Sequence, residues 1–121
     1  MFDPQKFSYM NLDRNIYGFN HSLEDWSEAE WTNALAGEAG EAANFGKKII
    51  RCSGGVAILN KGQTKEQYVA KLAEELADVV IYADLCAAKI GVNLWEEIIK
   101  KFNKTTRELG LDETRFCYKD E

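Results

Sequence analysis

This chain of 121 residues is poor in the features that interrupt helices or span membranes. Its only proline is Pro4, so no later proline breaks a helix. No apolar run approaches the roughly 20 residues that a membrane-spanning helix needs, and we expect no membrane association. The first residues lack the basic region and apolar run of a secretory signal. These absences favour a cytoplasmic protein built from uninterrupted helices.

Histidine and cysteine, the ligands of soft and borderline metals, are also scarce. The three cysteines, Cys52, Cys86 and Cys117, are odd in number, far apart and not in a metal-binding spacing. We expect reduced thiols, with Cys86 packed in the core. The single histidine, His21, lies outside any Glu-x-x-His motif, which excludes a helical di-iron site.

The charge and composition narrow the class further. The net charge is −5, which argues against a protein that binds a nucleic acid polymer through its phosphate backbone. Hydrophobic residues make up 45% of the chain and charged residues 29%, a balance typical of globular proteins. Because we find no internal repeat and no low-complexity tract, we expect residues 1–121 to form a single domain.

Capping signals and apolar periodicity predict four helices. Asp3 and Pro4 suit an N-cap and a first helical position. Ser27, Thr64 and Asn93 each precede a glutamate or glutamine by three residues, as at helix starts. The expected helices run from Pro4 to about Tyr17, and over residues 28–51, 65–90 and 94–109 approximately. A glycine-rich loop is expected between the second and third.

Four helices with mostly short connections predict an all-α, antiparallel four-helix bundle. The two longest helices would leave apolar faces poorly covered in a chain of this size, so we also expect a homo-oligomer.

Two pairs of acidic residues have the spacing of neighbours on a helix face. Glu38 and Glu41 are three residues apart in the second expected helix, and Glu75 and Asp78 are three apart in the third. Either pair alone is more typical of solvated surface. Two facing pairs would instead form a cage of carboxylate oxygens, the ligands that magnesium or manganese prefers.

The surroundings of both pairs favour the metal interpretation. Gly37, Gly40 and Gly46 lie within the second expected helix, where each costs about 1 kcal/mol relative to alanine. We expect another helix or a ligand to approach closely there. Residues 76–88 are apolar except for Asp78 and Asp84, which predicts a buried helix in which Asp78 needs a cationic partner.

Three ordered segments carry a resemblance to a known family. Residues 35–41 (LAGEAGE), 74–82 (EELADVVIY) and 101–103 (KFN) resemble segments of the MazG-like all-α nucleoside triphosphate pyrophosphohydrolases. The similarity extends from about Trp26 to Arg107. The 33 residues between Glu41 and Glu75 are more than in most relatives, and Lys48 stands where some pyrimidine-specific relatives have tryptophan.

The resemblance implies a chemistry and a set of site residues. Glu38, Glu41, Glu75 and Asp78 would hold Mg²⁺, with Mn²⁺ as a substitute, and act in catalysis. Water would attack the α-phosphorus of a (deoxy)nucleoside triphosphate, releasing pyrophosphate and a nucleoside monophosphate. Positions that match substrate contacts of the family are Tyr82, Lys101 and Asn103. Lys48 and Arg51 are further expected phosphate contacts because of their place near the acidic residues, not because of the resemblance. Members of the family assemble as dimers or tetramers, so the resemblance also implies a homodimer or homotetramer.

Several alternatives stay open. Lys48 and Arg51 equally suit a cationic helix end that complements the helix dipole. The aromatic residues Trp26, Trp31, Phe45 and Trp95 are more typical of a core than of a base-stacking site. The substrate is alternatively ppGpp or another pyrophosphate-containing nucleotide. A third hypothesis is a non-catalytic helical module that binds a nucleotide or a protein.

Overall fold

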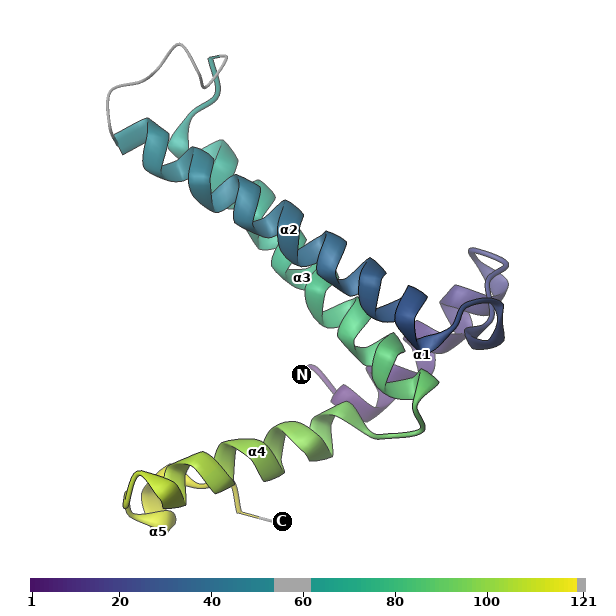
Figure 1. The fold of residues 1–121 in the computed structure, drawn as a ribbon. Helices are drawn as coiled ribbons and strands as arrows, with labels where there is room; N and C mark the ends of the chain where they lie inside the picture. The colour runs from purple at the N-terminus through teal and green to yellow at the C-terminus, as the bar shows by residue number, and fades with distance from the viewer. Residues whose placement is uncertain (54–61, 120–121) are drawn as a thin grey trace.

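The computed structural model describes residues 1–53 and 62–119, which form helices and no strands (Figure 1). The prediction of an all-α class with four main helices is therefore confirmed. A short 3-10 helix, η1, and a C-terminal turn of helix, α5, were not predicted. The elements are α1 (Pro4–Tyr17), η1 (Leu23–Asp25), α2 (Glu28–Ser53), α3 (Lys65–Lys89), α4 (Leu94–Glu108) and α5 (Glu113–Phe116).

The helices begin where the capping residues predict. The Asp3 carboxylate accepts a hydrogen bond from the backbone N–H of Lys6 at 3.1 Å. Thr64 and Gln67 form a reciprocal capping box, with distances of 3.2 and 2.8 Å between side chain and backbone. The predicted helix bounds agree with the structure within two residues. The predicted glycine-rich loop lies largely in residues 54–61, outside the described part of the chain.

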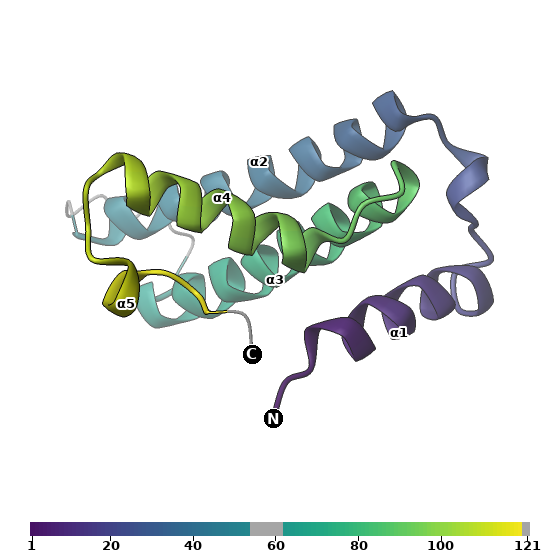
Figure 2. The same ribbon diagram turned by 90° about the horizontal axis from the view of Figure 1, so that it is seen from below.

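The centre of the molecule is an antiparallel hairpin of α2 and α3. The two helices lie side by side over most of their length in both views (Figures 1 and 2). Helix α1 and η1 pack against α3 near its C-terminal end. Trp31 of α2 is 1% exposed there, and its indole N–H donates to the carbonyl oxygen of Leu23 at 3.0 Å. The prediction that the tryptophans are structural is confirmed for Trp31.

A buried polar network joins three helices at this end. Asp84 of α3 is 5% exposed, and its carboxylate accepts hydrogen bonds from Ser8 Oγ at 2.7 Å and Asn11 Nδ2 at 3.1 Å on α1. The Ser8 hydroxyl oxygen accepts a hydrogen bond from Trp95 Nε1 of α4 at 2.7 Å. These hydrogen bonds satisfy the buried carboxylate of Asp84, and they fix α1 and the start of α4 on α3.

Helix α4 departs from the other helices after its first turns (Figure 1). Its apolar face is left open, with Ile98 44% exposed and Leu109 69% exposed. Together with Leu94, Phe102 and Phe116, these side chains line an apolar groove.

Two expectations about the hairpin are wrong for the single chain. A Cβ atom added at Gly37, Gly40 or Gly46 would meet no atom within 4 Å among the described residues, so no other helix of this chain approaches these glycines closely. The apolar stretch of α3 is also not buried all round, because Leu76 is 53% exposed. One chain supplies too few helices to cover every face of a hairpin this long.

Replacing Asp84 should separate α1 and α4 from α3. We expect Asp84→Ala to lower the free energy of unfolding by about 2 kcal/mol or more, because two hydrogen bonds to a buried carboxylate are lost. Urea denaturation measures the loss. The control is Asp13→Ala, which removes an exposed carboxylate of α1 and should change stability little. Equal stability of the two variants would contradict the structural role of Asp84.

Candidate metal centre

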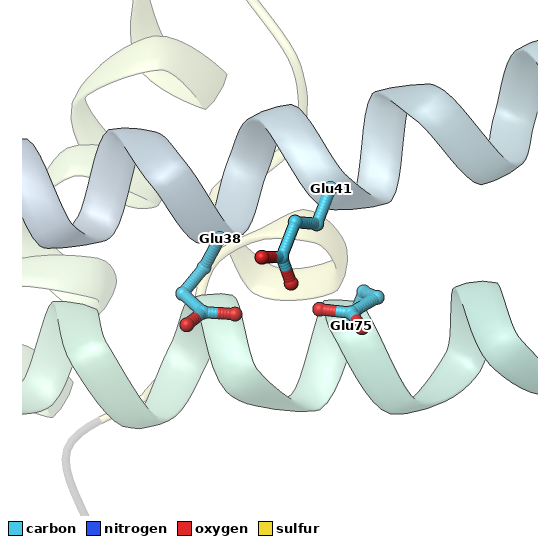
Figure 3. A group of neighbouring side chains, drawn as sticks. All are labelled: Glu38, Glu41 and Glu75. Atoms are coloured by element: carbon cyan, nitrogen blue, oxygen red, sulfur yellow. The ribbon is translucent and has the colours of Figure 1, made fainter.

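Three glutamates from the two hairpin helices converge at the α2–α3 interface (Figure 3). Glu38 and Glu41 point from α2 toward α3, and Glu75 extends from α3 between the helices. One carboxylate oxygen from each of the three residues belongs to a group in which all three atoms lie within 4.8 Å of one another. The three-residue spacing places the first two side chains on one helix face, and the antiparallel pairing brings the third opposite them.

The electrostatics of this cluster show that its negative charge is poorly compensated. Burial, a side-chain hydrogen bond with Glu41, and the charges of Glu41, Asp78 and Glu38 raise the pKa of Glu75 to about 7. Burial and the charges of Glu41 and Asp78 also raise the pKa of Glu38. Within residues 1–53 and 62–119, no lysine or arginine forms an ion pair with these acids.

An unpaired oxygen marks the position where a cation fits. Glu75 Oε2 is shielded from solvent and has no hydrogen-bond partner among the described residues. A buried acceptor without a partner carries a desolvation penalty, which a bound cation would remove. The cluster contains only carboxylate oxygens, the donor type that magnesium and manganese prefer. The residues present therefore fit a hard divalent cation.

Asp78 and Tyr82 follow Glu75 along the same helix, α3. Asp78 and Glu38 line one cavity, and the charge of Asp78 contributes to the raised pKa values of Glu38 and Glu75. Its oxygens lie outside the tightest group of three. Burial and the charges of Glu38, Asp78 and Glu41 raise the pKa of Tyr82. Both residues thus lie beside the cluster, and Asp78, predicted as its fourth member, is not within the group of three.

The predicted phosphate contacts on α2 lie at one end of the cluster. Lys48 Nζ lies 5.0 Å from the centroid of the Phe45 ring, and Phe45 follows Glu41 by one turn. Arg51 lies in the last turn of α2, ten residues and about 15 Å along the helix axis from Glu41. Of the two, Lys48 is the nearer to the acids.

The structure does not bring the predicted α4 residues to this site. Lys101 lies beside the apolar groove of α4. Asn103 is 8% exposed, and its side chain donates to the carbonyl oxygen of Tyr118 and accepts from the backbone N–H of Tyr118, at 3.1 and 2.9 Å. Within one chain, Asn103 therefore holds the C-terminal segment against α4.

Two groups of residues near the acids were not predicted. Lys71 of α3 lies opposite Lys48, with its Nζ 5.7 Å from the Phe45 centroid. Its place four residues before Glu75 puts it on the same helix face as that acid, but it was not predicted to contact the substrate. The second group, on and after α1, includes Arg14 and Phe19 and lines a cavity shared with Glu38 and Asp78. No local spacing indicates that α1 packs there.

Comparisons with known protein families, with curated proteins and with solved structures give no match to this chain. The described helices also include none with the length and apolar character required to cross a bilayer.

Removing the charge of Glu75 should stabilise the metal-free protein at neutral pH. The pKa of Glu75 is about 7 in the fold, against an ordinary value of 4.5. Between these values the folded state binds more protons than the unfolded state, so this residue lowers stability as pH rises. In EDTA at about pH 8, we expect Glu75→Gln to have a higher Tm than the wild type. The decrease in Tm between about pH 5 and about pH 8 should also be smaller in the variant than in the wild type.

The matched control is Glu74→Gln, which removes the same charge at an exposed neighbouring position. Thermal unfolding of both variants across this pH range makes the comparison. A lower Tm of Glu75→Gln than of the wild type at about pH 8 would show that Glu75 is not strained by its neighbours.

Proposed function

We propose that this protein is a magnesium-dependent nucleoside triphosphate pyrophosphohydrolase of the all-α, MazG-like type. The observation that carries the proposal is the convergence of Glu38, Glu41 and Glu75 around a shielded oxygen without a partner. The proposal also draws on the resemblance of residues 35–41, 74–82 and 101–103 to the family. Neither the acids nor the resemblance alone identifies the reaction.

The three glutamates and Asp78 would hold the magnesium. When bound, magnesium would neutralise the triphosphate and the charge that develops on the departing pyrophosphate. Glu41 is the exposed member of the cluster, so its carboxylate is open to solvent and able to orient a water molecule or accept its proton. Glu75 and Glu38 are more enclosed and are better placed to hold the cation.

The reaction consumes one water molecule. The water oxygen bonds to the α-phosphorus, and the bond between the α-phosphorus and the bridging oxygen breaks. The electron pair of that bond leaves on pyrophosphate, while a nucleoside monophosphate remains. One proton of the water ends on pyrophosphate and the other in solvent at neutral pH.

A panel of nucleotides incubated with the protein and magnesium tests the proposal. We expect pyrophosphate and a nucleoside monophosphate as products, identified by chromatography. Because each carboxylate is expected to touch the cation, Glu38→Gln and Glu75→Gln should each lower kcat/KM by at least about a hundredfold. The control, Glu74→Gln, should retain activity. Release of orthophosphate alone, or equal turnover by all the variants, would exclude the proposed reaction.

The same panel separates the other hypotheses. Cleavage of ppGpp, with no turnover of nucleoside triphosphates, would change the substrate but keep the site. Magnesium-dependent nucleotide binding without turnover of any compound would favour a non-catalytic module.

We further propose that the chain forms a homo-oligomer in which α4 contributes to the interface. Apolar side chains at positions 94, 98, 102 and 109 follow one face of α4, and the last three are exposed. Apolar burial is the main driving force for association. A second α4 or α3 would cover this groove and complete a helical bundle. Such an assembly would also be the route by which Lys101 of one chain meets the acids of another.

Acidic substitutions in the α4 groove should dissociate the oligomer. We expect Ile98→Asp combined with Leu109→Asp to place charges in the interface and to give monomers in size-exclusion chromatography with light scattering. The control is Lys100→Ala, on the opposite face of α4, where the lysine pairs with Glu97 at 3.1 Å. A wild-type protein that is monomeric at high micromolar concentration would contradict the proposal.

A further inference from the structure

The acidic cluster lies between two chemically different ends of the α2–α3 hairpin surface. One end is a cavity of about 490 Å³ between α1, the connection to η1 and the hairpin, and Glu38 and Asp78 form part of its wall. The other end lies toward the C-terminus of α2, where Lys48 and Lys71 flank Phe45. The acids separate the cavity from the lysines.

The cavity offers groups that both donate and accept hydrogen bonds. Asn15 is 7% exposed and lines it, and its Nδ2 donates to the carbonyl oxygen of His21 at 2.8 Å. Within the described chain no group donates to Asn15 Oδ1. Asn20, which also lines the cavity, has φ +53°, and this conformation turns the chain between Phe19 and His21. Amides suit the mixed donor and acceptor edge of a nucleobase.

Flat side chains at the cavity wall suit the faces of a base. The Arg14 guanidinium lies 5.7 Å from the centroid of the Phe19 ring, and Phe19 is 67% exposed. Although Glu38 and Asp78 line the same cavity, Arg14 forms no ion pair with either among the described residues. An exposed ring beside a guanidinium is a stacking platform for a heterocycle.

The opposite end is cationic. Lys48 follows Glu41 by seven residues and Lys71 precedes Glu75 by four, so both ammonium groups lie one to two turns beyond the acids. They lie 5.0 and 5.7 Å from the Phe45 centroid. Two neighbouring cations outside an acidic metal cluster attract the most highly charged part of a ligand, its terminal phosphates.

We propose that these two ends orient the substrate: the nucleoside occupies the α1 cavity, and the β- and γ-phosphates extend toward Lys48 and Lys71. This orientation rests on the proposed function, because it assumes that the α-phosphate lies at the acids. Pyrophosphate then leaves along the lysine end, and the monophosphate stays in the α1 cavity until it dissociates. The α1 cavity is therefore the part of the protein that recognises the base.

Binding of the two product fragments tests the orientation. Isothermal titration calorimetry with magnesium measures the affinity of the four common deoxynucleoside monophosphates and, separately, of pyrophosphate. We expect Phe19→Ala to weaken the tightest monophosphate about tenfold and to leave pyrophosphate unchanged, because only the stacking contact is lost. The Lys48→Ala, Lys71→Ala double variant should weaken pyrophosphate and leave the monophosphate unchanged.

Tyr17→Ala is the matched control for Phe19→Ala, since it removes an exposed aromatic ring that lies two residues away and outside the cavity wall. It should change neither affinity. Equal weakening of both fragments by Phe19→Ala, or weakening of the monophosphate by the lysine variant, overturns the orientation. So does a wild-type protein that binds neither fragment.

The turnover assay and the fragment-binding assay distinguish a failure of the proposed reaction from a failure of the proposed orientation. If triphosphates are hydrolysed but the variants do not weaken the binding of one fragment selectively, the proposed reaction is supported and the orientation is wrong. If each variant weakens only the expected fragment but no triphosphate is cleaved, the two-ended site is supported and the proposed hydrolysis is wrong. The binding measurement needs no turnover, so each result is obtained independently.

Discussion

The repulsion between carboxylates at the α2–α3 interface is the constraint on which the site depends. Glu38, Glu41 and Glu75 are held together by helices that contact each other along their length, and no described cation pairs with them. Like charges at this separation disfavour ionisation, especially where water is partly excluded. The raised pKa of Glu75 and its shielded oxygen without a partner are two consequences of the same arrangement. The fold is thus poised to gain stability from a cation.

Much of the helical structure could be predicted because its signals are local. A capping residue acts on backbone groups two or three positions away, and an apolar stripe repeats within one helix. The starts of α1 and α3 therefore follow from Asp3 and Thr64. The same reasoning identified the acids, since residues three apart on a helix share a face whatever surrounds them. The reaction itself was predicted only from the resemblance.

The remaining features depend on contacts between elements, which spacing within one element does not specify. Asn103 matched a family segment, yet in this chain its side chain bonds to the backbone of Tyr118, fifteen residues later. The glycines of α2 suggested a close neighbour, but the face that carries Gly37 and Gly40 is open. Likewise, the packing of α1 near the acids is set by its hydrogen bonds to Asp84, so the cavity could not be anticipated from α1 alone.

The acids and the cavity wall belong to different segments of the chain, and this separation has an evolutionary consequence. All four acids and both lysines belong to α2 and α3, whereas Arg14, Phe19 and Asn20 belong to a segment that precedes them in the chain. Changes in that segment would alter the wall of the cavity without moving the two helices that carry the acids. If the proposed function holds, a lineage of such proteins would be free to exchange one nucleotide for another while retaining the same phosphate chemistry.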